Sequence, residues 1–129
     1  MRRQFRVIVA GSRGATSYKT FRLLERKLNS ILEKKSITHD IIIISGTASG
    51  ADKLGERYAE DKNYTVKQFP ADWNKYGKRA GYMRNVEMAN NADALVALWD
   101  GQSRGTNHMI NIARMQGLPT RVIRYDWQQ

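Results

Sequence analysis

Residues 40–53, DIIIISGTASGADK, contain an apolar segment, then two glycines, and then a polar segment. The four isoleucines from Ile41 to Ile44 are apolar on both faces of an extended chain, which is typical of a central strand in a parallel sheet. Gly46 and Gly50 then interrupt the run, and Asp52 stands in the first turn of a predicted helix. This order predicts a strand that ends in a tight turn and leads directly into a helix.

The same alternation recurs along the chain. Short runs rich in β-branched or aromatic residues predict five strands, at residues 5–10, 40–45, 64–69, 94–99 and 120–125. Strands that alternate with helices imply right-handed crossovers and a parallel sheet covered on both faces. We therefore expect the α/β class, as a single Rossmann-like three-layer domain over residues 1–129 with a five-stranded, mainly parallel sheet. Apolar spacing assigns the packing faces of four helices to Phe21, Leu24, Leu28 and Ile31; Ala51, Leu54 and Tyr58; Met83, Val86 and Ala89; and Met109, Ile110 and Ala113.

Composition narrows the classes of function. The 129 residues contain no cysteine, which excludes disulfides and thiolate metal sites and fits a cytoplasmic protein. No apolar run approaches the roughly 18 residues of a membrane span, so we expect no membrane partner. Lysine and arginine number 22 against 12 acidic residues, giving a formal net charge of +10. Such a charge attracts polyanions or phosphorylated ligands, although a merely solubilising basic surface explains it equally well.

Glycine, hydroxyl and basic residues follow the first four predicted strands. The segments are GSRGATS from residue 11, GTASGAD from residue 46, PADWNKYGKRAGYMRN from residue 70 and DGQSRGTN from residue 100. In an open parallel sheet, the loops at the carboxyl ends of the strands share one edge, and ligands bind there. Glycine lets backbone amides approach a ligand, and a helix that starts directly afterwards attracts phosphate. The sequence therefore predicts a site for phosphate or ribose at this edge.

We assign ligand binding to residues of these four loops. Arg84 and Arg13 offer guanidinium groups, whose geometry suits a phosphate, with a surface salt bridge or a plain surface arginine as the alternative. The predicted ligand-binding residues are Gly11, Ser12, Arg13, Gly46, Thr47, Ser49, Gly50, Asp52, Asp72, Trp73, Arg84, Asn85, Gly105 and Thr106.

Several of these residues have a second interpretation. Trp73 and the neighbouring Tyr82 either stack on a base or close their loop over the core. Ser49 and Asp52 are equally suited to capping a helix, and Thr106 can cap a helix while the amides beside it receive an anion.

Spacing excludes two common phosphate motifs. GTASGADK lacks the adjacent Gly-Lys pair of a Walker A loop, and GSRGAT does not supply the dinucleotide fingerprint G-x-G-x-x-G. An ordinary P-loop NTPase and a hydride-transfer dehydrogenase are therefore not expected. His39 and His108 belong to opposite edges of the predicted sheet, and Asp72 and Asp100 are two scattered carboxylates, so we predict no metal and no cofactor.

The segments VIVAGSRG, ISGTASGAD, FPADWNKYGKRAGYMRN and SRGTNHMINIA together resemble the SLOG superfamily, most closely its YspA- and YpsA-related branch. The resemblance covers nearly the whole chain, from about Val7 to Pro119. It implies a Rossmann-like domain that binds a nucleotide or a nucleotide-derived ligand such as an ADP-ribose-like molecule or a nucleoside phosphate. Such a domain acts as a sensor, a sequestering protein or a processing enzyme, and relatives imply a homo-oligomer.

Two branches of the superfamily frame the choice of function. The cytokinin-activating phosphoribohydrolases hydrolyse an N-glycosidic bond with an arginine and a glutamate, and the resemblance places Arg84 at the arginine but Met109 at the glutamate. Methionine cannot act as a carboxylate, so that reaction requires Asp52, Asp72 or Asp100 as a substitute. The DNA-processing protein A family shares SGxAxGxD and an Arg-Asn pair, here SGTASGAD and Arg84-Asn85, and implies binding of single-stranded nucleic acid as the alternative function.

Overall fold

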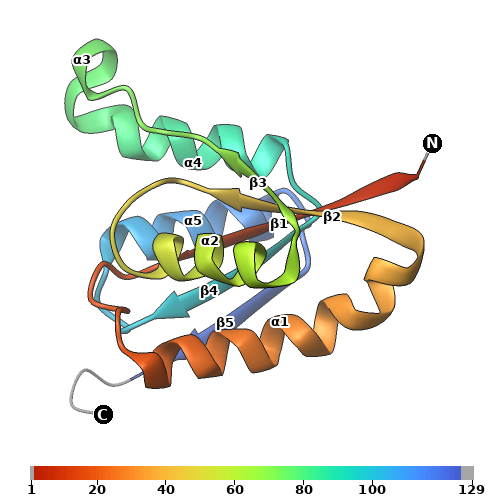
Figure 1. The fold of residues 1–129 in the computed structure, drawn as a ribbon. Helices are drawn as coiled ribbons and strands as arrows, with labels where there is room; N and C mark the ends of the chain where they lie inside the picture. The colour runs from red at the N-terminus through yellow and green to blue at the C-terminus, as the bar shows by residue number, and fades with distance from the viewer. Residues whose placement is uncertain (1, 126–129) are drawn as a thin grey trace.

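The computed structural model describes residues 2–125 and contains an alternating series of strands and helices (Figure 1). Within that range the order is β1 (Arg3–Gly11), α1 (Tyr18–Thr38), β2 (His39–Ser45), α2 (Ala51–Lys62), β3 (Thr65–Gln68), α3 (Trp73–Tyr76), the 3₁₀ turn η1 (Gly77–Arg79), α4 (Ala80–Asn90), β4 (Ala94–Trp99), α5 (Arg104–Met115) and β5 (Thr120–Arg124).

The five strands form one parallel sheet in the order β3-β2-β1-β4-β5. In the central register, Ile8 of β1 lies between Ile44 of β2 and Leu95 of β4. The chain moves outward from β1 through β2 to β3 and then crosses to β4 on the other side of β1. The strand order therefore reverses between β1 and β4, and the carboxyl end of this pair is the point where open α/β sheets bind ligands.

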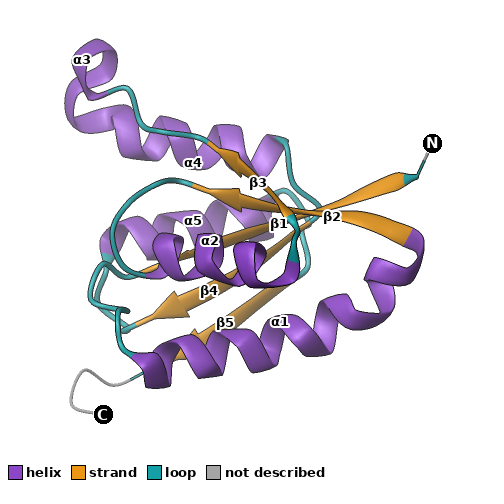
Figure 2. Ribbon diagram, in the orientation of Figure 1, coloured by secondary structure: helices purple, strands orange, loops and turns teal. Residues whose placement is uncertain are grey.

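Alternate residues of the central strands pack on opposite faces of the sheet. Val7 and Val9 join Ile41 and Ile43 in the core beneath α1 and α2. The intervening residues Ile8, Ala10, Ile42 and Ile44 join the core beneath α4 and α5. Figure 2 shows the resulting layers, with helices on both faces of the sheet. The four isoleucines are thus apolar because both faces of β2 are covered, and the predicted three-layer Rossmann-like fold is confirmed.

The segment between β3 and β4 is more ordered than the sequence predicted. The expected long loop contains α3 and η1, and α4 begins at Ala80. The predicted packing face of α4 was wrong at Met83 and Val86, which are exposed, while Asn85 is buried in their place. This helix packs mainly on α5, and the buried amide of Asn85 is satisfied by hydrogen bonds to that helix, so a polar residue is stable there.

Within residues 2–125, no helix combines the length and the apolar character that crossing a lipid bilayer would require.

Candidate nucleotide-binding site

A cavity of about 480 Å³ opens at the carboxyl ends of β1 and β4, where the strand order reverses. The turn after β1 forms one wall, the loop after β4 and the start of α5 form a second, and η1 and α4 form a third. Gly11 lines the cavity and packs closely on β4, since a Cβ at that position would lie 2.1 Å from the carbonyl oxygen of Leu98. The lining residues are Ala10, Gly11, Ser12, Arg13, Gly14, Ala48, Asp52, Trp73, Lys78, Gly81, Tyr82, Arg84, Asn85, Met88, Asp100, Ser103, Gly105, Thr106 and Met109.

The glycine turn after β2 is locked against the turn after β1. Gly50 has φ +80, and a Cβ there would lie 2.4 Å from the carbonyl oxygens of both Ser12 and Arg13. Ala51 N donates to the Ser12 carbonyl at 3.2 Å, and the Ser12 hydroxyl accepts from Asp100 N at 3.1 Å. Three loops therefore meet at Ser12, which is buried, and together they form a fixed wall of the cavity.

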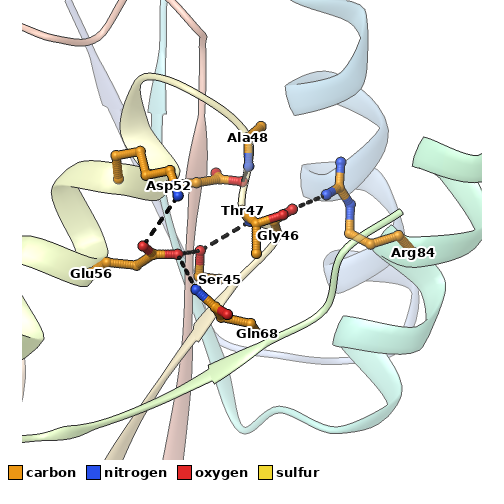
Figure 3. A network of polar contacts seen from close by, with 9 residues as sticks. Ser45, Gly46, Thr47, Ala48, Asp52, Glu56, Gln68 and Arg84 are labelled. Carbon is orange, nitrogen blue, oxygen red and sulfur yellow. Dashed lines mark hydrogen bonds and ion pairs between the residues drawn. The ribbon is translucent and has the colours of Figure 1, made fainter. Parts of the chain in front are cut away.

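Arg84 lines the cavity and joins α4 to the turn after β2. Its Nη1 donates to the carbonyl oxygen of Gly46 (Figure 3). Its Nε donates to Asn85 Oδ1 at 3.2 Å. A Cβ at Gly46 would lie 2.6 Å from Arg84 Nη1, so glycine is required for this approach. Burial lowers the pKa of Arg84, and nearby Arg13 acts in the same direction against the attraction of Asp52. The guanidinium is thus fixed, and a second cation stands close to it.

Asp52 is a buried carboxylate in the wall of the cavity, with 6% of its surface exposed. Its Oδ2 accepts a hydrogen bond from Ala48 N at 3.1 Å. Burial raises the pKa of Asp52 to about 6, although the Ala48 amide and Arg84 both act to lower it. The group therefore changes protonation near neutral pH while it faces the cavity.

A polar network behind the cavity holds the turn after β2. Ser45 Oγ donates to Glu56 Oε2 at 2.6 Å and accepts from Thr47 N at 3.1 Å (Figure 3). Gln68 Nε2 also donates to Glu56, at 3.3 Å. Burial acts to raise the pKa of Glu56, but the hydrogen bonds from Ser45 and Gln68 outweigh it and hold the pKa below its usual value. The network supports Thr47, which has φ +65, a conformation that a β-branched residue rarely adopts.

A second network lies on the far side of Arg84. Asn85 Nδ2 donates to the Gly105 carbonyl at 3.2 Å and lies 3.1 Å from His108 Nδ1. Because the amide nitrogen is a donor, His108 Nδ1 accepts, which places the ring proton on Nε2. Burial lowers the pKa of His108, in keeping with a neutral ring. The ring of Tyr82 contacts this imidazole, with centroids 4.5 Å apart.

Nine of the fourteen predicted ligand-binding residues line the cavity, and five do not. Gly46, Thr47 and Gly50 lie behind it and shape its wall through the contacts above, while Ser49 is exposed beside them. Asp72 instead accepts from Lys75 N at 3.0 Å as the cap of α3, and it borders a separate cavity of about 290 Å³. The nine lining residues are Gly11, Ser12, Arg13, Asp52, Trp73, Arg84, Asn85, Gly105 and Thr106.

Sequence reasoning missed Lys78 as a lining residue, because the turn η1 that positions it was expected to be loop. Together with Arg13 and Arg84 it brings three basic side chains to the cavity, against the acids Asp52 and Asp100. The ion pairs found within residues 2–125 involve none of these three basic residues. The cavity therefore carries cations that acidic side chains of the described chain do not neutralise by direct contact.

The acids and histidines of this region do not converge on one point. Asp72 and Asp100 border different cavities, and residues 2–125 contain no group of three side chains among His, Asp and Glu that is able to hold a metal ion.

Comparison with known proteins places the chain in a family. The sequence profile of the YspA, cpYpsA-related SLOG family, abbreviated YAcAr, matches residues 5–76. Gene 61 protein of Mycobacterium phage D29 is 37% identical over 87 residues, which cover 63% of this chain and 70% of that protein.

Solved structures show the same fold at low sequence identity. DNA processing protein A (DprA) from Streptococcus pneumoniae superposes with a TM-score of 0.73 at 15% identity, covering 96% of this chain and 51% of that chain. The protein TM1055 superposes with a TM-score of 0.63 at 22% identity, covering 92% of this chain and 72% of that chain. The chain thus spans about half the length of the pneumococcal protein. The profile match over residues 5–76 identifies the chain as a member of the YspA, cpYpsA-related SLOG family.

Proposed function

We propose that the chain binds a nucleotide or a nucleotide-derived ligand, such as a nucleoside phosphate or an ADP-ribose-like molecule, in the cavity between β1, β4 and α4. One observation carries the proposal: Arg13, Lys78 and Arg84 line a cavity of about 480 Å³ at the point where the strand order reverses. That volume lies within the range of about 300–1,000 Å³ that is usual for small-molecule sites.

The chemistry of the walls matches the parts of such a ligand. The guanidinium groups of Arg13 and Arg84 suit phosphate oxygens, and the start of α5, where Gly105 lines the cavity, adds a positive dipole end. The carboxylates of Asp52 and Asp100, which also line the cavity, are acceptors for ribose hydroxyls.

The proposal is for binding as a sensor or sequestering protein rather than for hydrolysis of an N-glycosidic bond. Met109 lines the cavity and is buried at the position where the phosphoribohydrolase pattern has glutamate. Asp52 is the buried carboxylate that remains nearby, but its Oδ2 already accepts the Ala48 amide. Incubation with nucleoside monophosphates should release no free base by liquid chromatography, and base release at enzymatic rates would assign the chain to the hydrolases.

Binding of single-stranded nucleic acid is the second candidate. The net charge of +10 favours it, and so does the likeness of the fold to a DNA-processing protein. Nucleic-acid binding that rests on phosphate contacts weakens steeply with salt. Binding of a mononucleotide in the cavity depends much less on the salt concentration, because it involves fewer phosphate contacts.

A thermal-shift experiment separates the two candidates. We expect ADP or ADP-ribose to raise the melting temperature at 150 mM NaCl, because a ligand that binds the folded state alone stabilises it. Arg84→Gln should abolish that shift. The matched control is Arg114→Gln, which removes an exposed arginine in the last turn of α5, at the opposite end of that helix from the cavity. Stabilisation by oligo(dT) alone, lost at high salt, would instead support the nucleic-acid function.

The absence of cysteine and the resemblance to oligomeric relatives lead us to propose further that the chain acts in the cytoplasm as a homo-oligomer of single-domain subunits. Light scattering after gel filtration measures the mass, and a single unfolding transition is expected. A monomeric mass, or two separate transitions, would contradict these points.

A further inference from the structure

Resting on the proposed function, we infer that Trp73 and Tyr82 form a base-stacking subsite at the mouth of the cavity. The ligand must then carry a planar aromatic ring beside its phosphates. A sugar phosphate or a bare polyphosphate lacks that ring and leaves this part of the cavity unfilled.

Trp73 lines the cavity, and 53% of its surface is exposed. It is the first residue of α3, a turn that Asp72 caps through Lys75 N. Its indole faces Gly81, where a Cβ would lie 3.4 Å from the indole Cη2 and 4.0 Å from Arg84 Nη2. The indole of Trp73 and the guanidinium of Arg84 therefore both lie within van der Waals reach of one point at the start of α4.

Tyr82 lines the same cavity with 45% of its surface exposed. His108 contacts its ring at a centroid distance of 4.5 Å and a tilt of 49°, and Asn85 in turn holds the imidazole through Nδ1. Since Asn85 Oδ1 also accepts from Arg84 Nε, one amide orients both the cation and the histidine behind the tyrosine. The phenol ring is therefore supported from behind and is preorganised to contact a ligand.

Other exposed large apolar residues occur elsewhere, for example Ile37 near the end of α1 and Met115 at the end of α5, and neither lines the cavity. Trp73 and Tyr82 differ from these because they are aromatic and share one cavity with Arg13 and Arg84. Aromatic side chains beside basic ones are the combination that holds a base and its phosphate, because any base can stack on an aromatic face. This combination points to a nucleoside phosphate.

Isothermal titration calorimetry at 150 mM NaCl tests the subsite with ADP, GDP, ribose 5-phosphate and pyrophosphate. The native chain should bind ADP or GDP at least about tenfold more tightly than either ligand that lacks a base. Trp73→Ala and Tyr82→Leu should each weaken nucleotide binding by roughly 5- to 150-fold, the range that base–aromatic stacking spans. Both variants should leave the affinity for pyrophosphate within about twofold, since stacking does not act on a ligand without a ring.

Met115→Ala is the control, because it removes an apolar side chain that is 81% exposed at the far end of α5. Circular dichroism verifies that each variant is folded. If nucleotides bind, and Arg84→Gln weakens them, while Trp73→Ala and Tyr82→Leu change nothing, the subsite is refuted and the proposed function stands. Equal affinity for pyrophosphate and ADP in the native chain also refutes the subsite. If the native chain binds none of the four ligands, the proposed function fails and the subsite fails with it.

Discussion

Replacing Asp52 by asparagine should stabilise the protein at neutral pH and not at acid pH. The carboxylate is buried in the wall of the cavity, and its Oδ2 accepts a hydrogen bond from the Ala48 amide. An asparagine oxygen can accept the same hydrogen bond without carrying a charge. Asp52 is thus expected to lower the free energy of unfolding at every pH at which it is ionised. A residue that costs stability in this way is expected to serve ligand binding rather than folding.

The sign and the size follow from the pKa of Asp52, which burial raises from 3.8 to about 6 in the folded protein. Between these two pH values the folded state binds more protons than the unfolded state, so stability falls as the pH rises through them and stays lower above about pH 6. A shift of roughly two units corresponds to about 3 kcal/mol at about 1.4 kcal/mol per unit. Asp52→Asn removes that loss, so its stability relative to the native chain should grow by about 2–3 kcal/mol between about pH 4 and pH 7.

Urea unfolding of the native chain and of Asp52→Asn at several pH values between 4 and 8 measures this difference. Subtracting one free energy of unfolding from the other cancels the contributions of all other titrating groups. Asp93→Asn is the control with the opposite sign. Burial acts to raise the pKa of Asp93, but the hydrogen bonds from Arg6 outweigh it and hold the pKa below its usual value. That variant should therefore be less stable than the native chain from pH 4 to pH 8 by a nearly constant amount, and the difference should shrink only as the pH falls below about 4. A stability difference for Asp52→Asn that stays constant from pH 4 to pH 8 would refute the reasoning.

Three further substitutions test the packing around the site. Gly46→Ala should weaken ADP binding at least about tenfold by calorimetry, because its Cβ would lie 2.6 Å from Arg84 Nη1 and displace it; unchanged affinity would contradict the role of that contact. Gly50→Ala should destabilise the fold by about 2 kcal/mol or more in urea, since φ is +80 and the Cβ would lie 2.4 Å from the Ser12 carbonyl; a loss within error would show that the two turns can separate. Leu28→Ala, in the buried face of α1, should destabilise by about 2–5 kcal/mol with ADP affinity retained, and an equal loss of binding would mean that the cavity is not independent of this core.

Much of the fold was predictable because buried parallel strands leave a strong pattern. The isoleucines of β2 are apolar on both faces because each face of the sheet is covered by helices. The ends of the predicted strands differ from those of the observed strands by a few residues at most. The turn after β2 was also predictable, since Gly50 has a positive φ and lies at the start of a helix. These are local properties, which a sequence carries directly.

The parts that failed depend on contacts between distant segments. The packing face of α4 was predicted wrongly at Met83 and Val86, because the buried residue is Asn85. Its hydrogen-bond partners, Gly105 and His108, come from another helix. The role of Glu56 in supporting Thr47 through Ser45 has no local signal at all, since Ser45 and Glu56 are eleven positions apart. Gly46 remains a predicted ligand contact, and the structure adds that its missing side chain makes room for Arg84, which the sequence did not indicate. Spacing along the chain cannot distinguish a residue that contacts a ligand from one that shapes the wall behind it.

The most direct test of the central claim is a two-dimensional ¹⁵N–¹H NMR titration of the native chain with ADP at 150 mM NaCl. Binding in the cavity predicts that the largest shifts fall on the amides of the turn after β1, on Ala48, and on Gly105 at the start of α5. Shifts confined to exposed basic residues of α1, such as Arg26, Lys27 and Lys34, or spectra unchanged at millimolar ADP, would contradict it.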